Sequence, residues 1–250
     1  MAQGNWSRLG ELGRRFGWQD FPTEVVIDGV TLPKSGLQYI EKHDHERLLC
    51  NFGVRAPRDK VRQETNPLFL EGGREANWFR VQPYLIALLL SRGTPRLWQG
   101  QEFCEKYFLP DDGLGRVRLE RPVRWDYFYD AIGKRSVRLA RDLLRLRRSA
   151  THLRSGNYFF FDHHDRYLTK GLILFARYQG AAYTLVAINL SGQEQWVPFW
   201  FPIAGDYREE LHGTQEPEPG LHLRNVQAWQ ERWLQIPANY GRVWTAAGRV

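Results

Sequence analysis

The chain has 250 residues, of which 42% are hydrophobic and 14% aromatic, so it can bury a substantial core and is not a disordered segment. Its net charge is +7, and its two cysteines, Cys50 and Cys104, imply no disulfide framework. No run reaches the roughly 18 apolar residues of a membrane helix, and no apolar signal region opens the chain, so we expect a cytoplasmic protein outside membranes.

The first 155 residues predict strands and helices that alternate along the chain. Residues 1 to about 30 are expected to be irregular, and GLQYIEKHD (36–44) predicts a short strand that runs into a loop. Residues 50–75 predict a long loop. ANWFRVQPYLIALLLSR (76–92) predicts a helix with a proline near its start, and TPRLWQGQEF (94–103) predicts a second short strand and loop.

Residues 133–149 predict an amphipathic helix with one basic face. Leucines recur at helical spacing on one side, and basic residues recur on another: Lys134, Arg138, Arg141, Arg145 and Arg148. We interpret this stripe as a solvated helix face. The alternative is a nucleic-acid-binding patch, but no zinc-finger, helix-turn-helix or RNA-binding signature accompanies it.

The pattern changes near residue 155. From 156 onward, short apolar runs such as GLILFARY, AAYTLVAINLS and WVPFWFPI alternate with turn residues, which is typical of an antiparallel sheet or sandwich. We therefore predict two domains, residues 1–155 and residues 156–250, of which the second is all-β. The run WVPFWF (196–201) is interpreted as inter-sheet core, with an aromatic binding platform as the alternative.

Several stretches, taken in order, resemble the C-terminal half of the α-amylase superfamily of glycoside hydrolases. YIEKHDHERLL resembles the motif at the end of the seventh barrel strand: His43 and Asp44 match, and Lys42 stands where asparagine is common. GTPRLWQGQEF resembles the eighth strand and its loop, with matches at Gly93, Pro95, Gly100 and Glu102 and with Trp98 in place of tyrosine. The ordered set, followed by a β-rich region, is specific where a lone His-Asp pair is not.

The resemblance extends over about residues 35–245 and implies the fold. The expected class is α/β plus β: a partial (β/α) TIM-type barrel of about the last two strand–helix units, followed by an antiparallel β-sandwich domain. Active sites of such barrels lie at the carboxyl ends of the strands, where residues 43 and 44 fall.

The resemblance also implies roles for individual residues. Asp44 would be the third carboxylate of the family, which stabilises the transition state, and His43 would bind a sugar hydroxyl beside it. Arg47, Trp98 and Glu102 are weaker substrate-binding candidates. Trp98 either stacks on a sugar ring or belongs to the barrel core.

A retaining glycosidase also needs a nucleophile and an acid about 5 Å apart, and the sequence contains no counterpart of either motif. Glu24 and Asp28 lack the arginine–aspartate context of the family's nucleophile. A complete barrel takes about 250 residues by itself. We therefore expect a truncated enzyme that is inactive as an isolated chain, or a chain whose missing barrel strands come from a partner.

The predicted function is that of an α-amylase-type glycoside hydrolase fragment acting on an α-glucan or malto-oligosaccharide. The alternative is a non-catalytic carbohydrate-binding or assembly protein. No organic cofactor is implied; calcium is common in the family, but no ligand set for it can be traced. FDHHDRY (161–167) is interpreted as a turn between strands rather than a metal site.

Overall fold

The computed structural model describes residues 8–18, 24–33, 36–43, 47–52, 74–106, 122–212 and 221–246. The α-helices are α1 (Leu9–Gly17), α3 (Arg74–Asn77), α4 (Gln82–Leu90), α6 (Trp125–Tyr129), α7 (Ala131–Ser149) and α8 (Thr151–Ser155). The short 3-10 helices are η2 (Leu48–Phe52), η4 (Trp78–Val81), η5 (Gln101–Phe103) and η6 (Leu168–Lys170). The strands are β1 (Glu24–Ile27), β2 (Val30–Pro33), β3 (Leu37–Gln38), β4 (Thr94–Pro95), β5 (Asn157–Phe160), β6 (Leu172–Gln179), β7 (Ala182–Asn189), β8 (Gln195–Trp200), β9 (Gly205–Glu209), β10 (Leu223–Val226), β11 (Glu231–Ile236) and β12 (Gly241–Ala246).

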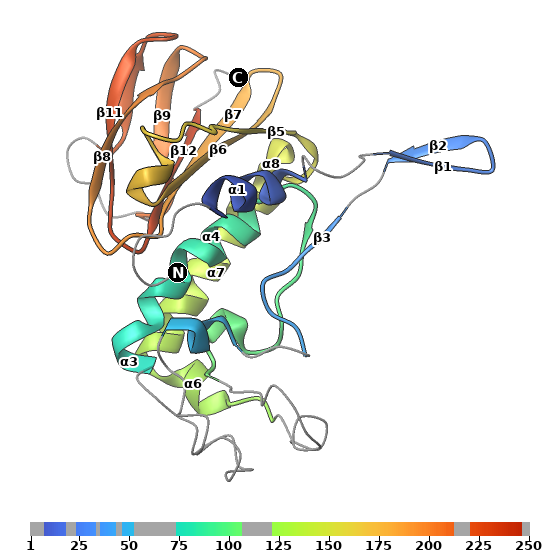
Figure 1. Cartoon of the computed structure of the whole chain (residues 1–250), viewed down its shortest axis with the longest axis vertical. Helices are drawn as coiled ribbons and strands as arrows, with labels where there is room; N and C mark the ends of the chain where they lie inside the picture. Colours follow the sequence, from blue (N-terminus) through green and yellow to red (C-terminus); the bar gives the residue numbers. More distant parts are fainter. Residues whose placement is uncertain are drawn as a thin grey trace.

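An antiparallel sheet of six strands organises the second half of the chain. Its order is β10-β9-β12-β7-β6-β5, and the hairpin β8–β11 forms a separate antiparallel pair beside it (Figure 1). Successive side chains of a strand point to opposite faces of the sheet. Residues Leu172 to Arg177 of β6 are all buried, so both faces of the sheet are covered there. Leu172 and Leu174 belong to the core between the sheet and the hairpin, whereas Ile173 and Phe175 belong to the core shared with helices.

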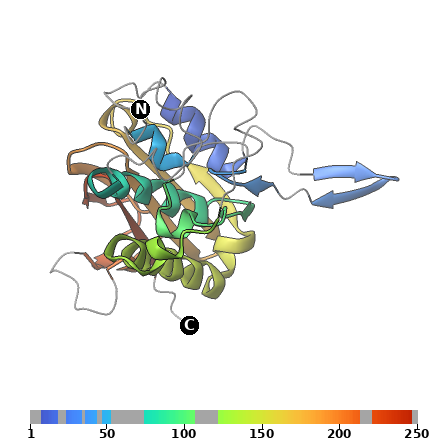
Figure 2. The same cartoon turned by 90° about the horizontal axis from the view of Figure 1, so that it is seen from below.

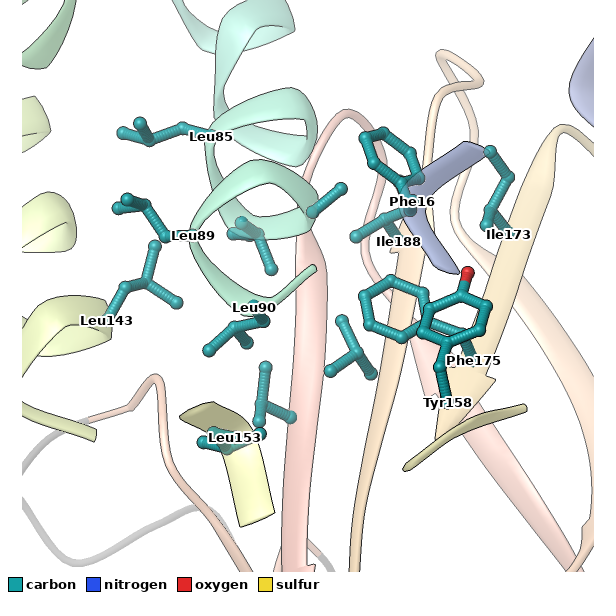
Figure 3. Packing of buried hydrophobic residues seen from close by; sticks show 14 of the residues in the cluster. Phe16, Leu85, Leu89, Leu90, Leu143, Leu153, Tyr158, Ile173, Phe175 and Ile188 are labelled. Carbon is teal, nitrogen blue, oxygen red and sulfur yellow. The ribbon is translucent and has the colours of Figure 1, made fainter. Parts of the chain in front are cut away.

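The helical layer packs against the other face of this sheet. Figure 3 shows Leu85, Leu89 and Leu90 of α4 in the same buried cluster as Phe175 of β6 and Ile188 of β7. Side chains from α1, α7 and α8 join the cluster, so the hydrophobic core crosses residue 155. The division into domains 1–155 and 156–250 therefore stays a prediction.

Buried arginines join the end of α4 to the sheet. Arg147 of α7 donates to the carbonyls of Leu89, Ser91 and Gly93, and Arg177 of β6 donates to the carbonyls of Leu90 and Ser91. The last carbonyls of a helix have no partner within the helix and carry partial negative charge. The two guanidinium groups satisfy them, and we call this region the helix–sheet junction.

The long helix is where the sequence predicts it, and its basic stripe is exposed. The helix α7 begins two residues before the expected start, where the Asp130 side chain accepts a hydrogen bond from the Gly133 N–H at 2.6 Å and caps it. All five residues of the stripe are exposed to solvent. Arg147 is not part of the stripe and lies on the buried side of the helix.

The N-terminal prediction was wrong. Residues 9–17 form the helix α1, and residues 24–33 form the hairpin β1–β2 around a turn at Asp28 and Gly29. The helix packs on the sheet because Leu9 and Phe16 are buried in the shared core. The hairpin projects away from the rest of the described structure in both views (Figures 1 and 2). An Asp-Gly turn between apolar runs is a hairpin signal that could have been recognised.

The predicted strands near residues 37 and 94 exist but are short. β3 and β4 pair in parallel over two residues each, with Leu37 opposite Thr94 and Gln38 opposite Pro95. The described part of the chain is thus a mixture of helices and mostly antiparallel sheet and contains no closed barrel. The helix predicted over 76–92 is divided by the 3-10 turn η4 and ends at Leu90, with Pro83 at its start as expected.

Candidate functional site

The candidate site lies beyond the carboxyl ends of β3 and β4. The Thr94 N–H donates to the Gly36 carbonyl and the Arg96 N–H donates to the Gln38 carbonyl, each at 2.8 Å. Gly93 allows this pairing: its φ is +93°, and a Cβ there would lie 2.5 Å from the Gly36 oxygen. The segments that follow the two strands, residues 39–43, 47–52 and 96–106, therefore begin side by side, and we call them the rim.

Arg47 fastens the two halves of the rim together. Its guanidinium donates to the Glu41 carboxylate at 3.0 Å and to the Glu105 carboxylate at 2.5 Å. It also donates to the Gln99 carbonyl at 2.5 Å, next to Trp98. Glu41 uses its second oxygen to accept from the Leu48 N–H at 2.8 Å. One buried cation thus links the segment around His43 to the segment around Trp98.

Gly100 makes room for this network. Its φ is +84°, a left-handed conformation that side-chain-bearing residues rarely adopt. A Cβ at this position would lie 2.0 Å from a carboxylate oxygen of Glu105. The glycine that the sequence motif contains therefore has a local cause: it lets Glu105 reach Arg47.

The network is buried and holds more carboxylates than guanidinium groups. Glu41, Arg47 and Glu105 are exposed by 3%, 5% and 2%. Burial raises the pKa of Glu41, although Arg47 and the Leu48 N–H oppose the rise. Burial likewise raises the pKa of Glu105 against the attraction of Arg47. The Arg124 guanidinium and a backbone hydrogen bond from Arg124 also lower the pKa of Glu105, but the effect of burial is larger.

The aromatic part of the rim brings together two of the predicted site residues. The rings of His43 and Trp98 lie 5.9 Å apart between centroids, and the Arg96 guanidinium lies 5.4 Å from the Trp98 ring. His43 is exposed and Trp98 is half-buried. The Trp98 backbone N–H donates to the Gln101 side chain at 3.1 Å, which fixes the turn after β4.

The other predicted residues have different surroundings. Asp44 lies outside the described residues, between Glu41 and Arg47 in the sequence. Glu102 is half-buried in η5. Arg47 was expected in the substrate groove, yet its burial and its three partners make it a residue that positions the rim and argue against direct contact with a ligand. Its substrate-binding role has no support in this geometry.

A second buried arginine holds the far end of the rim. Arg74 of α3 donates to the carbonyls of Phe103 and Cys104 and pairs with the Asp130 carboxylate. Burial raises the pKa of the Cys104 thiol to about 11, so this cysteine is a buried structural residue and not a nucleophile. The sequence pattern singled out neither Arg74 nor Glu105, because their partners are distant in the chain. It did not single out Glu41 either, although its partner Arg47 is six residues away.

No metal centre can be identified among the described residues. They contain no cluster of three or more His, Cys, Asp and Glu side chains that could hold a metal ion. The stretch 161–167 forms a turn after β5, as predicted, in which the Arg166 N–H donates to the His163 ring at 3.0 Å. Among the helices that the structure describes, none is long and apolar enough to span a bilayer.

No protein-family model matches the chain, and no curated protein matches it. Solved structures do. A pullulanase from Anoxybacillus sp. LM18-11 is 17% identical with a TM-score of 0.63; the match covers 98% of this chain and 31% of the pullulanase. A three-domain cyclomaltodextrin glucanotransferase, CldA, is 21% identical with a TM-score of 0.60, covering 98% and 41%.

An Anoxybacillus α-amylase is 19% identical with a TM-score of 0.55, and the match covers 86% of this chain and 38% of the amylase. The chain thus spans about a third to two fifths of the length of these structures. At this identity the likeness concerns the fold. The resemblance read from the sequence is confirmed at that level: the chain has the fold of part of an α-amylase-type glycoside hydrolase.

Proposed function

We propose that this chain is part of an α-amylase-type glycoside hydrolase that acts on α-glucans by a retaining mechanism. The rim supplies one side of the sugar-binding groove. Asp44 stabilises the transition state, His43 binds a sugar hydroxyl beside it, and Trp98 stacks on a sugar ring. Glu102 contributes at the edge of the groove.

The observation that carries this proposal is the Arg47 network. It ties the segment with His43 to the segment with Trp98 across two parallel strand ends, where barrel enzymes place their sites. Burying charges costs desolvation free energy, which ion pairs and hydrogen bonds offset only in part. A ligand site that needs both segments in fixed positions accounts for the cost.

In this proposal β3 and β4 are the last strands of a partial barrel, and β5 to β12 form the β-sandwich that follows it. The nucleophile and the acid come from strands outside this chain, in a longer polypeptide or a partner. The isolated chain then binds glucan without cleaving it at the rates of complete enzymes. The neighbouring structures give a suitable probe, since a related pullulanase was solved in complex with maltotriose.

Titration of the full chain with maltotriose in a calorimeter tests the proposal. We expect binding that Trp98→Ala weakens by about tenfold, in line with loss of an aromatic anchor. Arg138→Ala on the exposed stripe of α7 is the matched control and should bind as the wild type does. Unchanged affinity in Trp98→Ala would contradict the placement of the groove.

Turnover separates the proposed enzyme fragment from the alternative, a non-catalytic carbohydrate-binding or assembly protein. Glucan hydrolysis by the pure chain, abolished by Asp44→Asn, would contradict a catalytic set that is divided between chains. Hydrolysis that appears only when a polypeptide with the remaining strands is added, and that Asp44→Asn removes, would support it. Binding without turnover under both conditions favours the alternative.

A further inference from the structure

The hairpin β8–β11 has an outer face that the core does not use. The register pairs Trp196 with Gln235, Pro198 with Trp233 and Trp200 with Glu231. Side chains alternate along both strands, so Val197, Phe199, Leu234 and Ile236 are buried against the sheet. The outward set is Trp196, Pro198, Trp200, Glu231, Trp233 and Gln235, which we call the outer tryptophan face.

The stretch WVPFWF therefore divides between the two interpretations that the sequence left open. Its residues Val197, Phe199 and Phe201 are inter-sheet core, as predicted. Trp196 is 52% exposed, and Trp233 on the neighbouring strand is 56% exposed. Large aromatic side chains that lie together on a solvent-facing surface are typical of binding sites, whereas scattered exposed apolar residues are not.

The indoles of Trp196 and Trp233 make the same hydrogen bond to a nearby glutamate on each strand. The sequence Glu-x-Trp occurs at 194–196 and again at 231–233. In each case the indole Nε1–H donates to the glutamate two residues earlier, at 3.0 Å. The Gln235 side chain donates to the second oxygen of Glu194 at 2.7 Å and links the strands. The rings are anchored at their edges, which restrains their orientation.

The geometry of the strands sets the spacing of these rings. Trp196 and Trp233 are diagonal neighbours across the antiparallel pair, a relation that places residues about 7–8 Å apart. The Arg166 guanidinium lies over the third indole, Trp200, at 4.6 Å. Trp196 and Trp233 are therefore the platform, with carboxylate and amide acceptors around them.

The polar groups around the outer tryptophan face favour some ligands over others. Glu194 and Glu231, which bind the two exposed indoles, repel the phosphates of a nucleic acid, whereas Arg166 and Lys170 lie at Trp200 and at the Trp196 backbone. A symmetric contact with a second copy would set these glutamates close to their own counterparts, and six outward side chains fall short of the roughly 20–30 residues a side of stable protein interfaces. A neutral polyhydroxylated ligand fits: its apolar ring faces pack on the indoles, and its hydroxyls donate to the carboxylates.

We propose that the outer tryptophan face is a second carbohydrate-binding site, separate from the rim, that holds consecutive sugar rings of a glucan chain on Trp196 and Trp233. The choice of an α-glucan rests on the proposed function, whereas the site itself rests on its own residues. Such a surface keeps a polymeric substrate on the protein while the rim engages one segment of it.

Affinity electrophoresis of the full chain in gels that contain soluble starch tests the site. The double variant Trp196→Ala/Trp233→Ala should bind starch about tenfold more weakly. Its affinity for maltotriose at the rim should be unchanged. The variant Trp125→Ala is the matched control, because it removes a tryptophan that is 60% exposed on α6. Circular dichroism checks that each variant is folded.

A second variant tests whether the glutamates that hold the indoles contribute to starch binding. Glu194→Gln/Glu231→Gln removes the anchoring charges while leaving the indoles, so starch affinity should fall by less than in the tryptophan variant. Wild-type affinity should also be insensitive to salt, as expected for a neutral ligand.

The outcomes separate the two proposals. Starch affinity that is unchanged in Trp196→Ala/Trp233→Ala but reduced in Trp98→Ala overturns the second site and leaves the proposed function intact. Absence of starch and maltotriose binding in the wild type overturns both. A wild-type dimer that the tryptophan variant converts to a monomer, without starch binding, assigns the face to self-association and overturns its carbohydrate role.

Discussion

The rim and the helix–sheet junction both bury arginines, and they neutralise them in different ways. In the rim, Arg47 meets two carboxylates and Arg74 meets one. At the junction, the partners of Arg147 and Arg177 are backbone carbonyls. Carboxylates titrate and carbonyls do not, so the contacts of Arg47 in the rim should respond to pH more strongly than those of Arg147 at the junction. The partners of Arg47 in the rim can therefore change their charge, whereas the carbonyl partners of the arginines at the junction cannot.

The largest effect on stability should come from the junction. Arg177→Met removes a donor from the buried carbonyls of Leu90, Gly156 and Asn157, and each group left unsatisfied costs about 1–3 kcal/mol. The Ser91 and His152 carbonyls keep a second donor, the Arg147 side chain and the Gly156 N–H. We expect the free energy of unfolding to fall by about 5 kcal/mol or more, measured by urea denaturation. Arg138→Met on the exposed face of α7 is the control; an equal loss in both variants would contradict the role of the junction.

The rim should give the next largest effect. Arg47→Met leaves Glu41 and Glu105 buried without their cation, and we expect a loss of about 3 kcal/mol at neutral pH. The loss should be smaller than at the junction because the carboxylates can take up protons, whereas carbonyls cannot. Urea denaturation at pH 7 and at pH 5 measures this: the deficit of the variant should shrink at pH 5. A deficit equal at both values would show that the carboxylates are not involved.

A smaller loss should follow from crowding the network. Gly100→Ala puts a side chain in the left-handed conformation and against the Glu105 carboxylate, for a loss of about 2 kcal/mol. Gly180→Ala is a matched control, since Gly180 has a φ of +57° and no atom lies within 4 Å of an added Cβ. Thermal denaturation measures the loss of stability in both variants. The difference between the two losses is the cost of the contact with Glu105, because backbone strain is present in both. Equal losses would mean that strain alone is responsible.

The smallest expected effect is a change in pH dependence. The raised pKa of Glu41 means that the native state holds more protons than the unfolded state above the ordinary value of this carboxyl. Its contribution to stability is therefore full below that value and is lost as pH rises through the raised pKa. Glu41→Gln should flatten the decline in the free energy of unfolding that begins above the ordinary pKa of a glutamate. If the free energy of unfolding of Glu41→Gln declines with pH as steeply as that of the wild type, Glu41 is not the group responsible.

The junction provides the internal reference for that measurement. The partners of Arg147 are backbone carbonyls, which do not titrate, so the loss caused by Arg147→Met should be the same at pH 5 and at pH 8. Arg177→Met cannot serve as this reference, because burial and the charge of Arg177 together lower the pKa of His152. A loss in Arg147→Met that varies with pH would remove the distinction between the two regions.

The sequence predicted local features well and long-range ones poorly. The helix over α7 followed from the spacing of its leucines, and the β-rich region followed from short apolar runs between turns. The fold resemblance was carried by motif residues such as Gly93 and Gly100, whose conformations the structure explains. The helix α1 was missed because its nine residues include three glycines, which disfavour a helix until tertiary packing stabilises it.

The sequence motifs propose the residues of the candidate site, but they do not indicate the residues that hold them in position. His43 and Trp98 come from motifs far apart in the chain, and the structure places their rings together. Glu105 could not be identified from spacing, since its partner Arg47 is 58 residues away, and Glu41 was not singled out although Arg47 is 6 residues away from it. Arg47 was placed in the groove because its sequence neighbours belong to a motif, whereas its buried position depends on contacts with the segment after β4.

A double-mutant cycle on maltotriose affinity with His43→Ala, Trp98→Ala and the combined variant tests whether the rim is a glucan site. If the rim is one sugar-binding site, each single variant weakens binding, and the combined loss differs from the sum of the two, because residues in contact couple. Losses that add would indicate independent roles. Wild-type affinity in all three variants would contradict the account of the rim as a glucan site.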